Sequence, residues 1–199
     1  MTQYAIIFAL YTALTPWHQD RAEVNRDHRM GVLTESTKRT VNRATCDDGT
    51  RKNCVSIWPG TSQELTALLI TTGWWESRFA KHIHEDRCRG FECDAFKLPG
   101  GRVIYRAKST WQVQSSPLVP IKVWRTIGGS DLESTTRAAL AATRVLSMAR
   151  TRCGEVNGDW VASTISLYAT GRTCRWPKAH NRVVMYKKIY DRYEELENQ

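Results

Sequence analysis

The sequence predicts a mainly α-helical domain that carries one small β-hairpin. Three observations predict it: capping residues precede several apolar-periodic segments, glycines end two of them, and a short β-rich run follows a Pro-Gly-Gly break. With 199 residues, 41% hydrophobic and 25% charged, the chain can bury one core of ordinary size. We expect residues 1–45 to form an N-terminal helical segment, packed on or preceding the core, and residues 46–199 to form the main domain.

The N-terminal stretch MTQYAIIFALYTALTP has its apolar residues at helical spacing and predicts a packed amphipathic helix. The residues on that face are Tyr4, Ile7, Phe8, Tyr11 and Leu14. A signal peptide or anchor over residues 1–16 stays open, because the apolar run has the right length, although no Lys or Arg precedes it. No stretch is long enough for a transmembrane helix. Residues 18–44 are polar and predict one or two surface helices.

The best-marked helix begins at Thr61, which forms a capping box with Glu64, and runs to residue 79. Helical spacing places these residues on one face: Leu65, Leu69, Thr72, Glu76 and Phe79. Gly73 inside this helix costs about 1 kcal/mol relative to alanine. Close approach of another backbone or of a ligand explains that cost.

Further helices follow along the chain. Ser130 and Glu133 predict a second capping box for a helix over 132–153 that Gly154 ends, and Asp159 predicts the cap of a helix that Gly171 ends. A last helix is predicted to begin at Pro177. Five of its side chains are expected to face the core: Val183, Tyr186, Ile189, Tyr190 and Tyr193. Between the major helices, the RVIY run that ends at residue 105 predicts the hairpin.

The six cysteines allow 15 pairings, and neighbours in sequence give the simplest one. These pairs are Cys46–Cys54, Cys88–Cys93 and Cys153–Cys174. Disulfides indicate an oxidising compartment or a particle exposed to one, whereas free buried cysteines are the alternative. No pair has the spacing of a zinc site. A metal site at His82, His84 and Asp86 is disfavoured, since its fourth member, Cys88, suits a disulfide better.

The formal net charge of +9 predicts attraction to a polyanion, such as nucleic acid, an anionic membrane or the bacterial wall, or it serves solubility alone. The stretch 171–192 concentrates this charge, with seven Lys or Arg against one acid. It suits an anionic wall polymer, and it also suits nucleic acid, with Trp176 and Tyr186 as stacking groups. No helix-turn-helix, zinc-finger or RNP signature supports nucleic acid.

Glu76 is the candidate for chemistry because it lies on the apolar stripe between Trp74 and Trp75 on one side and Arg78 on the other. Desolvation raises the pKa of such a carboxyl, which can then deliver a proton to a leaving oxygen. This is the acid half of glycoside hydrolysis. The alternative is a buried glutamate neutralised by Arg78, Arg87 or another cation.

Three short motifs occur in the order WESRF at 75–79, STWQ at 109–112 and LYATG at 167–171. In these motifs the chain resembles the lysozyme-like domain of soluble lytic transglycosylases and goose-type lysozymes, over roughly residues 60–190. The sequence departs from the family pattern at Ser109 (usually glycine), Trp111 (usually methionine) and Ala169 (usually asparagine). These departures bear on the shape of the sugar groove and not on the acid.

The resemblance implies site residues. Glu76 matches the catalytic glutamate, and the substrate-binding set is Ser77, Gln112, Gln114, Tyr168 and Trp111. The two glutamines are expected to bind acetamido or hydroxyl groups, and Tyr168 to place its hydroxyl near Glu76. Trp111 and Trp75 are expected to stack on sugar faces. Structural roles remain open for all of these: turn-stabilising amides, a core tyrosine and core tryptophans.

The resemblance also implies a lysozyme-like fold whose hairpin flanks a substrate cleft, and cleavage of the β-1,4 bond between N-acetylmuramic acid and N-acetylglucosamine. A lytic transglycosylase leaves 1,6-anhydro ends and needs no second carboxylate, whereas a hydrolase needs one. Four loop residues are candidates for that second carboxylate: Glu85, Asp86, Glu92 and Asp94. The alternative is that all four are solvated surface charges. No cofactor or metal is implied.

The implied partners are peptidoglycan glycan strands, with no specific nucleic acid and no stable membrane span, and the chain is expected to be a monomer. The implied location is extracytoplasmic (periplasmic or secreted), or phage-encoded and wall-directed. The alternative is a non-catalytic protein that binds wall glycan or builds a virion and retains the same fold.

Overall fold

The computed structural model describes residues 1–15, 26–46, 56–87, 95–97, 99–101, 103–154 and 156–199. Within these ranges the chain is mainly helical. The α-helices are α1 (Gln3–Leu14), α3 (Arg26–Thr45), α4 (Ser62–Ser77), α5 (Lys81–His84), α6 (Ile121–Trp124), α7 (Leu132–Cys153), α8 (Trp160–Thr170) and α9 (His180–Glu197). Short 3₁₀ turns cover Val156–Gly158 and Pro177–Ala179.

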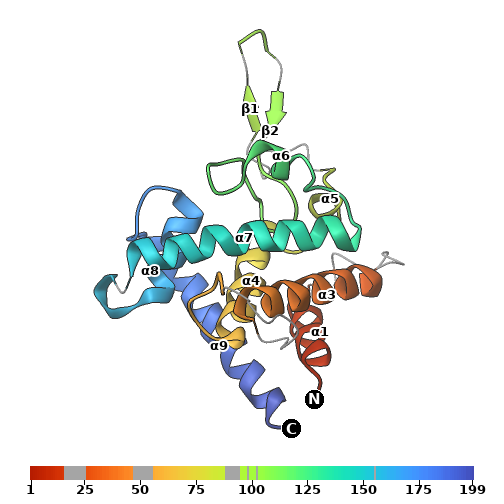
Figure 1. Cartoon of the computed structure of the whole chain (residues 1–199), viewed down its shortest axis with the longest axis vertical. Helices are drawn as coiled ribbons and strands as arrows, with labels where there is room; N and C mark the ends of the chain where they lie inside the picture. Colours follow the sequence, from red (N-terminus) through yellow and green to blue (C-terminus); the bar gives the residue numbers. More distant parts are fainter. Residues whose placement is uncertain (16–25, 47–55, 88–94, 98, 102, 155) are drawn as a thin grey trace.

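Two short strands accompany the helices. Strands β1 (Ala95–Lys97) and β2 (Val103–Tyr105) pair antiparallel, in the region where the sequence predicts strand residues. With three residues each, they leave the class mainly α. Figure 1 shows the pair at one end of the molecule, above α6, and the two chain termini close together at the other end.

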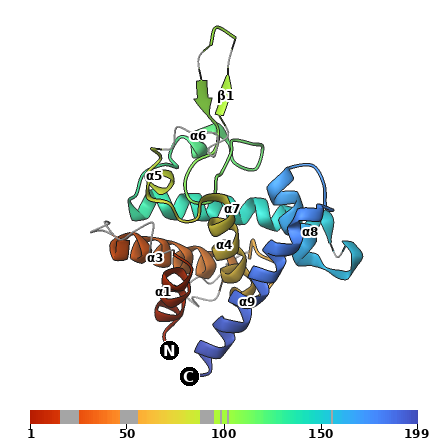
Figure 2. The ribbon, with the colours of Figure 1, turned by 180° about the vertical axis from the view of Figure 1, so that it is seen from behind.

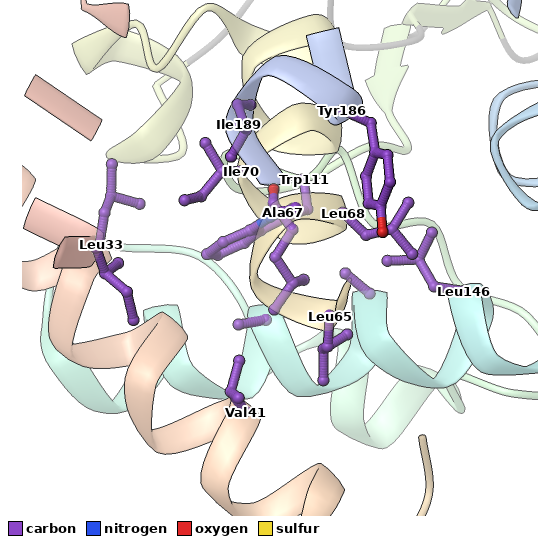
Figure 3. Close-up of a cluster of buried hydrophobic side chains, with 14 of the residues drawn as sticks. Leu33, Val41, Leu65, Ala67, Leu68, Ile70, Trp111, Leu146, Tyr186 and Ile189 are labelled. Atoms are coloured by element: carbon purple, nitrogen blue, oxygen red, sulfur yellow. Dashed lines mark hydrogen bonds between the residues drawn. The ribbon is translucent and has the colours of Figure 1, made fainter. Parts of the chain in front are cut away.

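Helix α4 forms the centre of the fold. It packs on α9, α3, α7 and α1, while α7 also packs against α3 and α8 (Figures 1 and 2). Figure 3 shows Leu65, Leu68 and Ile70 of α4 surrounded by core side chains from the other helices. These partners include Leu33 and Val41 from α3, Leu146 from α7, and Tyr186 and Ile189 from α9.

The start of α4 is as predicted. The Thr61 hydroxyl accepts a hydrogen bond from the Glu64 backbone N–H, and the Glu64 carboxylate accepts one from the Thr61 N–H. The predicted single apolar face was too narrow, because every residue from Leu65 to Gly73 is buried. Helices pack on more than one side of α4, so its sequence is apolar nearly all round.

Gly73 is required by side chains and not, as expected, by another backbone or a ligand. A Cβ at this position would lie 3.0 Å from the Phe79 ring, 3.0 Å from the Thr110 methyl and 3.3 Å from Trp111 Nε1. Gly73 therefore admits the segment around Trp111 to the surface of α4.

The later helix boundaries are mostly as predicted. Asp159 caps α8, and Gly171 ends it in the left-handed conformation with φ 66°. The cap of α7, however, is Asp131, whose carboxylate accepts from the Ser134 N–H. The predicted Ser130–Glu133 box was therefore wrong by one residue, since Asp131 offers the stronger acceptor at the first turn.

The N-terminal helices are more buried than their sequences suggested. In α1 the buried residues include Ile6 and Leu10, while Tyr4 of the predicted face is 37% exposed. The predicted surface helix α3 is instead a core helix that packs on α7. Its buried Ser36 lies 3.4 Å from the Thr136 hydroxyl of α7, because small hydroxyl side chains let the two helices approach closely.

Cys153 and Cys174 form a disulfide that connects the end of α7 to the segment after α8, as the sequence predicts. Cys46 is also disulfide-bonded. Its predicted partner Cys54, and the predicted pair Cys88–Cys93, lie outside the described residues.

None of the helices in the described ranges combines the length with the apolar character that crossing a bilayer requires.

His84 gives the fold a specific pH dependence. Burial, with a smaller contribution from the charge of Arg29, lowers its pKa to about 4, against the opposing effects of Glu85, the Ser130 backbone and Asp131. Between about pH 6.5 and pH 4, His84 binds a proton in the unfolded chain but not in the folded one. The free energy of unfolding therefore falls as the pH falls through this range. We expect a loss of about 2 kcal/mol between pH 7 and pH 5.

Urea denaturation of wild type and His84→Gln at these two pH values measures that loss. The free energy of unfolding of the variant should fall about 2 kcal/mol less than that of wild type. His28→Gln, at an exposed position, is the control and should follow wild type. An equal fall in the free energy of unfolding for wild type and His84→Gln would refute the lowered pKa of His84.

Candidate active site at the end of helix α4

Glu76 lies in the last turn of α4, where Arg78 takes the left-handed conformation and ends the helix. Its carboxylate accepts a 2.5 Å hydrogen bond from the guanidinium of Arg182 on α9, and the two side chains are only 21% and 13% exposed. The prediction that apolar side chains surround Glu76 therefore missed one charged neighbour. Of the sequence alternatives, a glutamate paired with a cation describes this geometry, but the cation is Arg182 and not Arg78 or Arg87.

Arg78 instead packs on the tryptophans. Its guanidinium carbon lies 3.3 Å from the centroid of the Trp74 ring and 4.8 Å from that of Trp75. Burial lowers the pKa of Arg78, and the positive charge of Arg182 adds to this effect. Two arginines thus flank the end of α4, and among the described residues it is Arg182 that forms the ion pair with Glu76.

Tyr168 brings α8 to the same place. Its hydroxyl donates a 2.7 Å hydrogen bond to the backbone carbonyl of Trp111. Burial raises the pKa of this phenol well above its ordinary value, and the negative charge of Glu76 raises it further, against Arg182. The predicted placement of the Tyr168 hydroxyl beside Glu76 stays a prediction, because the hydrogen bond of this hydroxyl goes to the Trp111 carbonyl.

A groove of about 520 Å³ runs beside Tyr168. Its lining includes both candidate glutamines, Gln112 and Gln114, together with Tyr168, Ala169 and Gly171. The amide of Gln112 donates 3.2 Å to the Ser109 carbonyl, so this side chain also stabilises its turn. Residues from the second and third sequence motifs thus line one groove.

Two of the predicted substrate-binding residues were wrong. Trp111 is fully buried, and its indole N–H donates 2.9 Å to the Leu69 carbonyl, so it offers no ring face to a sugar. Ser77 is buried too, and its hydroxyl is occupied, since it donates to the Gly73 carbonyl and accepts from the Phe79 N–H. Both residues build the end of α4 and its packing instead of contacting a ligand.

A second pocket, of about 470 Å³, adjoins Arg182 and is called the tryptophan pocket below. It is lined by Trp75, Trp176, Pro177, Lys178, His180, Asn181 and Arg182. Sequence reasoning did not identify Arg182 as a site residue. The available signal was the basic stretch 171–192, which contains Arg182 together with Lys178, His180 and Asn181 of this lining.

The loop carboxylates considered for a second catalytic group are paired where they are described. Asp86 lies 3.4 Å from the Lys108 ammonium, and Glu85 pairs with Arg87. Glu92 and Asp94 lie outside the described residues. Within the described ranges no group of three or more His, Cys, Asp or Glu side chains is placed to hold a metal ion.

Replacement of Tyr168 tests how α8 is joined to the site. Tyr168→Phe removes the hydroxyl that donates to the buried Trp111 carbonyl, so this carbonyl loses that hydrogen bond. We expect the free energy of unfolding to fall by about 1 to 3 kcal/mol in urea denaturation. Tyr4→Phe, at a partly exposed tyrosine of α1, should change it by less than about 0.5 kcal/mol. Equal effects of the two variants would contradict a structural role for the Tyr168 hydroxyl.

No protein-family model, curated protein or solved structure matches this chain.

Proposed function

We propose that this protein cleaves peptidoglycan glycan strands at the β-1,4 bond between N-acetylmuramic acid and N-acetylglucosamine, with Glu76 as general acid and base. The observation that carries the proposal is the convergence of three motifs far apart in sequence. Glu76 lies in the last turn of α4, and Trp111 of the second motif packs beside Gly73 of the same helix. Tyr168 of the third motif donates to the Trp111 carbonyl, and Gln112 and Gln114 line the groove beside Tyr168. The resemblance to soluble lytic transglycosylases and goose-type lysozymes supplies the reaction.

The backbone at Ser109 supports the match to the second motif. The family has glycine at this position, and Ser109 adopts a left-handed φ of 62°, which glycine adopts at little cost. Gly171, retained from the third motif, is left-handed as well, with φ 66°. Both positions where the family pattern has glycine thus adopt a backbone conformation that glycine favours.

The proposed outcome is that of a lytic transglycosylase. Glu76 gives a proton to the glycosidic oxygen as the bond from that oxygen to C1 breaks. The resulting carboxylate takes the proton of the muramyl 6-hydroxyl, whose oxygen bonds to C1 and closes the 1,6-anhydro ring. No water is consumed, so no second carboxylate is required. Pairing of Asp86 with Lys108 and of Glu85 with Arg87 is consistent with this choice.

The lysozyme-like architecture belongs to the same proposal. In it, the strand pair β1–β2 is the wing that flanks the substrate cleft, and the helices α4, α7, α8 and α9 form the helical body. An extracytoplasmic or phage-encoded, wall-directed protein fits the Cys153–Cys174 disulfide and the net charge of +9. Activity as a monomer and without cofactor or metal is part of this proposal.

The ion pair between Glu76 and Arg182 favours a second candidate function, in which the chain binds wall glycan or builds a virion without catalysis. A carboxylate held by a guanidinium is not itself a proton donor. The same groove and tryptophan pocket would serve binding alone.

Release of dye from labelled, purified peptidoglycan separates the two functions. We expect the full chain to release soluble fragments, and equally well after addition of a metal chelator. Retention on the wall without any release would instead support the binding function. Retention tested at about 0.5 M salt excludes the weak attraction that any basic protein has for a polyanion.

A further inference from the structure

The tryptophan pocket has the chemistry of a site for an anion with an attached ring. Trp75 and Trp176 contribute aromatic rings to its wall. Lys178, His180 and Arg182 contribute basic side chains. None of the seven described residues that line it is acidic. Aromatic faces suit sugar rings, and a guanidinium in partly buried surroundings binds a carboxylate in two-pronged geometry.

Arg182 belongs to this pocket and to the candidate active site at once. Its guanidinium carbon lies 5.0 Å from the centroid of the Trp176 ring and 5.5 Å from that of Trp75. The same guanidinium donates to Glu76 at 2.5 Å. One cation therefore contacts the candidate catalytic carboxylate and lines the cavity next to it.

We propose that the tryptophan pocket binds a carboxylate-bearing unit of the glycan, and that this carboxylate takes the Arg182 guanidinium from Glu76. The proposal rests on the proposed function, and it removes the conflict between the ion pair and a proton-donating role. One carboxylate replaces another at Arg182, so the guanidinium keeps a counter-charge throughout. Glu76, released from the guanidinium, is then free to act as the acid and base of the proposed reaction. Arg182 is thus a positioning residue that couples substrate binding to the state of Glu76.

The carboxylate has two chemical sources in peptidoglycan, the lactyl ether of the muramyl sugar and the stem peptide. Either matches the pocket, because the Arg182 guanidinium, which now donates to one oxygen of Glu76, can bind any carboxylate. A neutral N-acetylglucosamine chain has neither group. The exchange therefore predicts a preference for anionic over neutral glycan that depends on Arg182.

Binding without turnover tests the preference. Tryptophan fluorescence titrations of the full chain at about 0.15 M salt use three tetrasaccharides: neutral N-acetylglucosamine, peptide-free alternating muramyl glycan, and the same glycan with stem peptides. We expect wild type to bind an anionic tetrasaccharide about tenfold more tightly than the neutral one. Preference for the peptide-free muramyl glycan identifies the lactyl carboxylate, and preference for the peptide-bearing one alone identifies the stem peptide.

Arg182→Gln should bind anionic and neutral tetrasaccharides equally. Lys187→Gln is the matched control, because it removes the same charge from an exposed position of α9 outside the pocket. It should keep the tenfold preference. Lys178→Gln, an exposed residue of the pocket, leaves the partner of Glu76 in place and should lower the preference about threefold, even if Arg182→Gln fails to fold.

Glu76→Gln tests the exchange itself. Without the Glu76 carboxylate to compete for Arg182, binding of the anionic tetrasaccharide should strengthen severalfold and that of the neutral one should not change. An unchanged anionic affinity in Glu76→Gln, or a preserved preference in Arg182→Gln, would overturn the inference. These outcomes are independent of cleavage, so a chain that shows the preference but releases no wall fragments refutes the proposed function and not the pocket.

Discussion

Glu76→Gln is expected to lower the rate of wall cleavage by about a hundredfold to ten-thousandfold, the range that a general acid and base contributes. The amide has nearly the shape of the carboxyl and can still accept from Arg182, but it has no acidic proton to give to the glycosidic oxygen. Dye release from labelled peptidoglycan measures the rate. The fold should persist, because Glu76 lies at the partly exposed end of α4 and not in its core.

The control for this change is Glu133→Gln, which removes the same charge from an exposed position of α7. It should keep the wild-type rate. Thermal unfolding of both variants shows whether any loss of rate comes from loss of folded protein. Equal rates for wild type and Glu76→Gln would mean that the carboxyl does not act in the reaction.

Trp111→Ala is expected to lower the free energy of unfolding by about 3 to 5 kcal/mol, the cost of deleting a large buried aromatic side chain. Trp111 is fully buried against α4, and its indole donates to the Leu69 carbonyl, so the change leaves a cavity and an unpaired acceptor. Urea denaturation measures the loss. Trp111→Phe refills part of the volume without the donor and should cost less than Trp111→Ala.

The exposed apolar residue Val184 of α9 provides the comparison, since Val184→Ala should change stability by less than about 0.5 kcal/mol. A loss below about 1 kcal/mol for Trp111→Ala would contradict the packing described here. It would also reopen the sequence-based assignment of Trp111 to a sugar-contacting surface.

Local signals predicted several helix boundaries and predicted burial poorly. The end of α4, expected at residue 79, lies at Ser77. The Thr61–Glu64 box and the Gly171 terminus depend on a few neighbouring residues, so their chemistry is complete within the local sequence. The burial of α3 depends on α7, about 100 residues later, as the Ser36–Thr136 contact illustrates. A polar sequence with many threonines therefore predicted a surface helix, whereas α3 is a core helix in the fold.

The candidate site shows the same division. The resemblance assigned Tyr168 and the two glutamines to one substrate-binding set, and these three residues line one groove. Arg182 could not be paired with Glu76 from spacing, because the two are 106 residues apart and meet only when α9 packs on α4. For Trp111 the chemistry of an indole allows either a sugar platform or a core anchor, and only its packing decides between them.

Mass spectrometry of the products from purified peptidoglycan tests the central claim most directly. If Glu76 acts as the acid and then the base on the muramyl 6-hydroxyl, wild type yields fragments with 1,6-anhydromuramyl ends, and Glu76→Gln yields none. Fragments with reducing muramyl ends would assign the attack to water and contradict the transglycosylase outcome. Absence of any cleaved glycan from the wild-type digest would contradict the enzymatic function itself.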